Sequence, residues 1–103
     1  MTRSIAVMLL LLTSSCSNGE RYPDAAAFKS DVEQWGVVGR SLNVAIAEFV
    51  KRGFTCGEAY CSRGVGGPVC AQQLRVNLSV DASGNVSEFA VQTIDGKLPD
   101  VCL

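Results

Sequence analysis

The first regular pattern of apolar and polar positions along the chain has the spacing of a helix. Apolar side chains recur every three or four residues, at Ala25, Phe28, Val32 and Trp35. Asp24 stands directly before them and is a residue type that caps helix N-termini. The spacing therefore predicts an amphipathic helix that begins after Asp24 and buries one narrow apolar face.

A second stretch with the same spacing follows Ser41 and predicts another helix. Ser41 is a suitable N-cap and Gly53 a suitable stop, and the apolar face between them consists of Leu42, Ala45, Ile46, Phe49 and Val50. Gly36 and Gly39 separate the two stretches, and each glycine inside a helix costs about 1 kcal/mol relative to alanine. We expect two helices, with one kinked helix over residues 24–52 as the alternative.

Beyond Gly53 the period changes to that of β-strands. Residues 54–62 contain aromatic and β-tolerant side chains and predict a short strand. Residues 69–80 predict a second strand, because alternate positions are apolar at Leu74, Val76, Leu78 and Val80. We expect these four side chains to face a core and their polar neighbours to face water.

A turn and a third strand follow. The sequence of residues 81–85 is typical of a turn, and residues 86–94 predict a returning strand. Val86 is out of phase with Phe89 and Val91, which indicates a bulge or twist near Ser87. Residues 95–103 are expected to form a tail. The order predicts an α+β fold, with the helices packed on a three-stranded antiparallel meander.

The N-terminal residues have the layout of an export signal. Arg3 precedes the apolar residues 5–12, a run far shorter than the roughly 18 residues that a membrane-spanning helix needs. Small side chains then occupy positions 13–15, directly before Cys16. An ordinary secretory signal cleaved after a small residue is one interpretation of this layout.

The same residues resemble the lipobox of bacterial lipoproteins, although Thr13 stands where leucine is commonest. The resemblance implies a signal peptide over residues 1–15, cleavage before Cys16, and fatty acyl chains such as palmitate on that cysteine. Several acyl chains give a durable membrane anchor. Ser17, in place of an aspartate, implies the outer membrane facing the periplasm in hosts that sort lipoproteins as enteric bacteria do.

Residues 16–23 would then form a tether and residues 24–103 a single small domain. Ser17 is the first of seven tether residues after the anchor, which reach about 25 Å when fully extended. The domain is therefore expected to stay close to its membrane.

Composition narrows the chemistry of this domain. The chain has 103 residues, nine Lys plus Arg and ten Asp plus Glu, and the resulting net charge of -1 argues against nucleic acid as a partner. It has no histidine, which excludes Ser-His-Asp and Cys-His catalysis and His-ligated zinc. We predict no catalytic residue, no metal ligand and no cofactor.

Five cysteines are an odd number, and lipidation of Cys16 leaves four to pair in an oxidising compartment. If Cys56 and Cys61 share one strand, they lie about 16 Å apart, too far for a disulfide. We therefore expect Cys61 to bond to Cys70 and Cys56 to bond to Cys102, with the reverse assignment as the alternative. No CxxC pair supports a zinc ribbon or a redox motif.

The glycine-rich residues 62–68 lack the ending of a phosphate-binding loop and predict a flexible connection between strands. A functional interpretation is a contact loop over residues 62–69 that presents Arg63 to a partner. Tyr60 and Glu58 precede this segment and are further candidates for partner contact.

The order of a helix pair and then a sheet, with Gly39, Ser41 and Gly53 at its joints, is similar to a module of outer-membrane assembly lipoproteins and β-lactamase-inhibitor-like domains. The similarity covers residues 24–94, but the fuller motif around the second helix and the cysteine set differ. It implies a fold and carries over no functional residue.

These observations predict a membrane-anchored module of the bacterial envelope that binds an envelope protein, as an accessory, inhibitor or immunity-type protein, and is not an enzyme. The alternative is a small envelope ligand carrier or an enzyme of unknown chemistry. The small size argues against this alternative, because a domain that must fill its own core has little room for a cavity.

Overall fold

The computed structural model describes residues 21–67 and 69–102 and shows a two-layer α+β fold. The elements are α2 (Ala25–Gln34), α3 (Leu42–Lys51), β1 (Thr55–Cys56), β2 (Tyr60–Gly66), β3 (Cys70–Val80), β4 (Val86–Val91) and β5 (Asp100–Cys102). The predicted fold class is confirmed, but the antiparallel sheet has five strands where three were expected. The predicted signal peptide and Cys16 lie outside the described residues.

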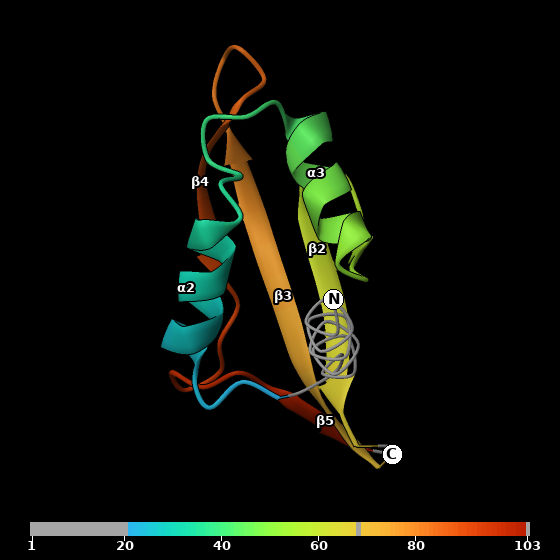
Figure 1. Ribbon diagram of the computed structural model, residues 1–103. Helices are drawn as coiled ribbons and strands as arrows, with labels where there is room; N and C mark the ends of the chain where they lie inside the picture. Colours follow the sequence, from blue (N-terminus) through green and yellow to red (C-terminus); the bar gives the residue numbers. More distant parts are fainter. Residues whose placement is uncertain (1–20, 68, 103) are drawn as a thin grey trace, which may run out of the picture.

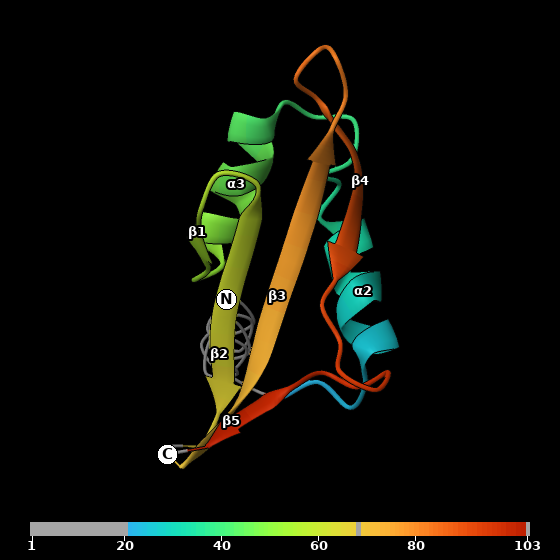
Figure 2. The same cartoon turned by 180° about the vertical axis from the view of Figure 1, so that it is seen from behind.

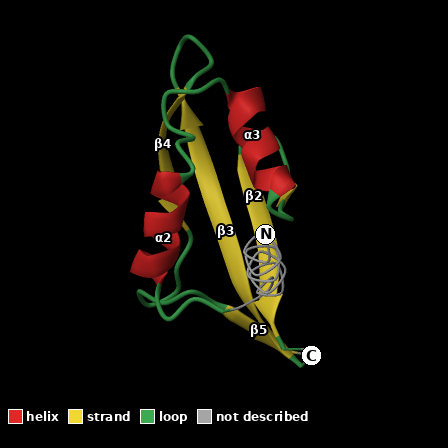
Figure 3. Ribbon diagram, viewed as in Figure 1, coloured by secondary structure: helices red, strands yellow, loops and turns green. Residues whose placement is uncertain are grey.

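Both helices lie on the same face of the sheet (Figure 1). Helix α2 runs beside β4 and helix α3 beside β2, so that β3 lies between them (Figure 3). From behind, the sheet lies in front and the helices behind it (Figure 2). Within the described residues, α2 and α3 therefore cover one face of the sheet, and neither helix covers the other face.

The two helices begin where their capping residues stand. The side chain of Asp24 accepts a hydrogen bond from the amide of Ala27, and the hydroxyl of Ser41 accepts one from the amide of Val44. Between the helices, Gly36 and Gly39 have φ values of 69° and 90°, in the left-handed region that ends a helix. The prediction of two helices is confirmed over the single kinked helix.

Strand β3 is the centre of the sheet. It pairs with β2 along one side and with both β4 and β5 along the other. Its inward side chains include Leu74, Val76 and Leu78, which are buried as the alternation predicts. Val80 was expected on the same buried face but is 39% exposed, because the pairing with β4 becomes irregular there.

The β3–β4 connection follows the sequence prediction. The carboxylate of Asp81 accepts hydrogen bonds from the amides of Ser83 and Asn85, which close the turn. Ser79 pairs with Glu88 and Val80 pairs with Val86, so Ser87 has no residue opposite it. The predicted bulge near Ser87 is confirmed.

Three predictions about the strands are wrong. Residues 54–62 are not one strand, because the chain reverses between β1 and β2 and pairs Thr55 with Ser62. The glycine-rich residues 62–68 are mainly strand, since β2 runs on to Gly66 and pairs with β3 along its whole length. The tail contains β5, whose Val101 pairs with Ala71 of β3.

The four described cysteines form two disulfides, but the predicted pairing is wrong. Cys56 bonds to Cys61 and Cys70 bonds to Cys102. The separation of about 16 Å assumed one continuous strand. The reversal after β1 instead makes Cys56 and Cys61 direct partners across a hairpin, with their Cα atoms 4.0 Å apart. Cys70 and Cys102 are likewise direct partners on β3 and β5.

The core between helices and sheet contains a cluster of aromatic rings. The ring of Phe28 stacks on that of Phe54, with centroids 6.2 Å apart, and Trp35 meets Phe49 and Phe54 edge to face. Phe28 and Phe49 are completely buried. Phe54 lies between α3 and β1, so this cluster joins both helices to the start of the sheet.

Replacing a ring of this cluster should destabilise the domain strongly. Phe28→Ala is expected to lower the free energy of unfolding by about 3–5 kcal/mol, because it leaves a cavity among rings that cannot collapse. Urea denaturation followed by Trp35 fluorescence measures the change. Val44→Ala in the exposed face of α3 is the control and should stay within about 0.5 kcal/mol of the native chain. Equal losses in the two variants would contradict the assignment of the core.

The disulfide pairing predicts a simple peptide map. Trypsin cleaves after Arg52, Arg63, Arg75 and Lys97. Without reductant, peptide 53–63 should therefore be released alone with an internal disulfide, while peptide 64–75 stays joined to peptide 98–103. Mass spectrometry distinguishes this map from the sequence-based pairing, which would join all three peptides in one species.

Candidate functional site

The sheet face that α2 and α3 do not cover carries the outward side chains of β2–β5, and we call it the open face. Its position follows from the strand register, because Tyr60 lies opposite Asn77 and Ser62 lies opposite Arg75. Residues on either side of these positions, such as Cys61 and Val76, point inward and are buried. The reader can follow these strands from behind in Figure 2.

Arg75 and Tyr60 contact each other in the middle of the open face. The guanidinium carbon of Arg75 lies 4.0 Å from the centroid of the Tyr60 ring, which is a cation–π contact. Among residues 21–67 and 69–102, no carboxylate forms an ion pair with this arginine. The guanidinium is therefore fixed in position by an aromatic ring, with its charge not neutralised.

A hollow of about 320 Å³ adjoins Arg75 on this face, and we call it the Arg75 hollow. The polar residues that line it are Ser62, Gln73, Arg75 and Gln92. Its apolar lining consists of Ile94, Pro99 and Val101. Ile94 is 59% exposed and Val101 54% exposed. The hollow thus combines hydrogen-bond donors with an apolar side that is open to contact.

The structure separates the three residues predicted for partner contact. Tyr60 lies on the open face, whereas Arg63 lies on the helix side and donates a hydrogen bond of 2.7 Å from Nη1 to the carbonyl of Arg52. Glu58 is exposed in the turn between β1 and β2. Arg63 therefore joins the end of α3 to the sheet instead of projecting from a loop.

Arg75, and not the predicted Arg63, is the arginine on the open face, and it was not among the residues predicted for partner contact. The alternation along β3 contained the signal, because Arg75 falls between Leu74 and Val76 and so belongs to the outward set. The alternation could not predict that β2 is a long strand. The pairing of β2 with β3 brings Tyr60 next to the outward side chains of β3.

A second group of polar contacts holds the residues that precede α2. The backbone of Tyr22 exchanges two hydrogen bonds with the side chain of the buried Gln72, one of 2.8 Å and one of 3.0 Å. Arg21 forms an ion pair with Asp100 of β5. A Cβ atom on Gly66 would meet Arg21 at 2.8 Å, so the glycine leaves room for this segment. Residues 21–22 are therefore tied to the sheet.

The Tyr22 hydroxyl donates a hydrogen bond of 2.6 Å to the carboxylate of Asp31 on α2. Burial raises the pKa of Tyr22 from 10.0 to about 12, and the hydrogen bond to Asp31 adds to the effect. Since the phenol ionises at lower pH when unfolded, its contribution to stability is present below pH 10 and is lost as the pH rises from 10 to about 12. This group stabilises the fold and is not poised for acid–base chemistry near neutral pH.

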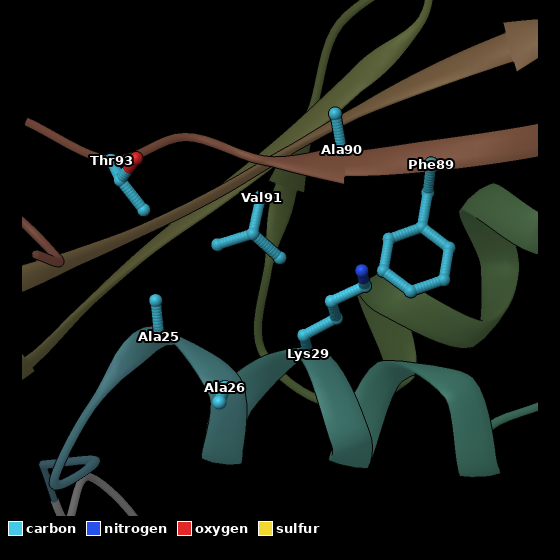
Figure 4. A pocket seen from close by; sticks show the side chains of 7 residues that line it. All are labelled: Ala25, Ala26, Lys29, Phe89, Ala90, Val91 and Thr93. Carbon is cyan, nitrogen blue, oxygen red and sulfur yellow. The ribbon is translucent and has the colours of Figure 1, made fainter. Parts of the chain in front are cut away.

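A third feature is a crevice of about 330 Å³ between α2 and β4 (Figure 4). Ala25 and Ala26 line it from the helix, and Phe89 and Val91 line it from the strand. The side chain of Lys29 extends beside the Phe89 ring in Figure 4. The small alanine side chains account for the space, and the lysine is the one ionisable group in its described lining.

Within the described ranges, no three His, Cys, Asp or Glu side chains are grouped so that they could hold a metal ion. Nor is any helix of the described ranges long and apolar enough to cross a membrane. No protein-family model, no curated protein and no solved structure matches this chain. Its function is therefore argued from its own residues.

The raised pKa of Tyr22 can be measured directly. In a Tyr60→Phe background, Tyr22 is the one remaining tyrosine. Its ultraviolet absorbance should titrate with a midpoint near 12. Asp31→Asn removes the negative charge that the phenol faces and should move the midpoint downward. A midpoint near 10 in the Tyr60→Phe chain, or no change on Asp31→Asn, would contradict the role of burial and of the Asp31 contact.

Proposed function

We propose that the chain is a small lipid-anchored protein of the bacterial envelope that binds a partner protein through the open face of its sheet. Cys16 is the proposed anchor, and the resemblance of positions 13–16 to a lipobox supports it. Two disulfides in the domain suit an oxidising compartment outside the cytoplasm. The proposed location is the outer membrane, facing the periplasm.

The observation that supports the binding role is the Arg75–Tyr60 pair at the centre of the sheet face that α2 and α3 do not cover. Tyrosine and arginine are among the residues that most often dominate the energy of protein interfaces. A solvent-facing sheet is normally polar throughout. Here two half-exposed apolar side chains, Ile94 and Val101, line the same hollow as Arg75.

The disulfides support the same surface from both sides. Cys61 follows Tyr60 directly, and its bond to Cys56 fixes the hairpin that carries the tyrosine. Cys102 follows Val101, and its bond to Cys70 fixes β5 against β3. A surface held in this way loses little conformational entropy on binding, which favours affinity.

Metabolic labelling tests the anchor. Radioactive palmitate should label the native chain, and Cys16→Ser should abolish the label and release the protein from the membrane fraction. Ser17→Ala is the matched control and should be labelled normally. Equal labelling of the native chain and Cys16→Ser would contradict the anchor.

Crosslinking in intact cells of the native host tests the binding face. A photoreactive p-benzoylphenylalanine in place of Asn77 lies on the open face, and the same group in place of Val44 lies on the exposed side of α3. We expect one discrete protein adduct from position 77 and none from position 44. No adduct from position 77, or the same adducts from both positions, would overturn the proposal that this face binds a protein.

A further inference from the structure

The charge and shape of the Arg75 hollow identify the kind of group that the partner presents. Resting on the proposed function, we infer that the hollow binds the carboxylate of an aspartate or glutamate side chain, in a segment of the partner that carries an apolar side chain next to it. The Arg75 hollow is thus a carboxylate-recognition site on the open face.

Arg75 provides the positive charge that would attract a carboxylate to the hollow. Of the described strand residues that point outward, Arg75 and Glu88 are the charged ones, and Glu88 pairs with Ser79 toward the far end of β3. Four residues along a strand separate Arg75 from Ser79, a distance of about 13 Å. Glu88 is therefore too far away to pair with the guanidinium, and no other carboxylate of the described residues forms an ion pair with it.

The N–H groups of the Arg75 guanidinium have a geometry that suits a carboxylate. Contact with an aromatic ring uses the face of a guanidinium and leaves its edge N–H groups available, and two of these match the two oxygens of a carboxylate. The ring of Tyr60 provides this contact at 4.0 Å. Ser62, Gln73 and Gln92 line the same hollow. Their hydroxyl and carboxamide groups are of types that can donate further hydrogen bonds.

The apolar side of the hollow suits an apolar side chain next to the acid. Ile94, Pro99 and Val101 line it together with the polar groups, and none of the three can hydrogen-bond a carboxylate through its side chain. A volume of about 320 Å³ suits a few side chains rather than a large cofactor. An acidic residue with an apolar neighbour would contact both sides of the hollow at once.

Nuclear magnetic resonance of the mature lipoprotein in detergent micelles tests the inference. The probes are acetyl-leucyl-glutamyl-leucine amide, its glutamine counterpart as the neutral control, and acetyl-leucyl-leucine with a free C-terminal carboxylate. We expect the glutamate peptide to shift the side-chain resonances of Arg75, Gln73 and Gln92, with an affinity at least about ten-fold above that of the glutamine peptide.

Matched variants assign the effect to the guanidinium. Arg75→Gln should abolish the preference for the glutamate peptide, and Arg75→Lys should weaken it because an ammonium lacks the planar pair of donors. Arg40→Gln makes the same change in charge at an exposed position in the loop before α3 and should keep the full preference. Unchanged backbone resonances away from the hollow show that each variant is folded.

Several outcomes would overturn the inference. If millimolar glutamate peptide causes no shift, or if the glutamate and glutamine peptides bind equally, the hollow does not recognise a carboxylate. If the peptide with a free C-terminus binds more tightly than the glutamate peptide, the ligand is a chain terminus and not an acidic side chain. The protein adduct from position 77 provides the separate readout: an adduct of undiminished yield in Arg75→Gln would refute the carboxylate site while leaving the binding role of the face in place.

Discussion

Burial of Phe28, Val32 and Phe49 against the inner face of the sheet determines how the rest of the molecule is arranged. These side chains are 0% exposed, and they come from two helices that both need the same apolar surface. A five-stranded sheet of this size offers one such surface, because its opposite side carries the alternate polar positions. The helices therefore gather on one side, and the side left without them becomes the open face.

The sequence pattern predicted the parts of this arrangement that depend on near neighbours. Asp24 and Ser41 cap the helices as expected, and the alternation around Leu74 and Val76 gave the correct inward side of β3. The bulge at Ser87 was visible because Val86 breaks the phase of its strand. Each of these features is encoded within a few residues, where spacing and residue type suffice.

What the sequence did not reveal depends on long-range pairing. The three residues between β1 and β2 have no strong turn signature, so the reversal was missed, and with it the bond between Cys56 and Cys61. Strand β5 is three residues long and shows no alternation of its own; it forms because β3 offers unpaired backbone groups beyond the end of β4. The glycines of β2 suggested a loop, yet they pair with β3 in regular register. The candidate site could not be predicted for the same reason, because the β2–β3 register is what brings Arg75 and Tyr60 into contact.

The contacts of Arg21 and Tyr22 with Asp100 and Gln72 bear on how such a domain would search for its partner. If Cys16 is the anchor that we propose, the residues from 16 to the fixed Arg21 reach at most about 17 Å, less than the tether that the sequence suggested. The domain would then stay close to the bilayer surface and diffuse with its anchor in two dimensions. Confinement of this kind raises the effective concentration of any partner that shares the membrane and excludes those that do not approach it.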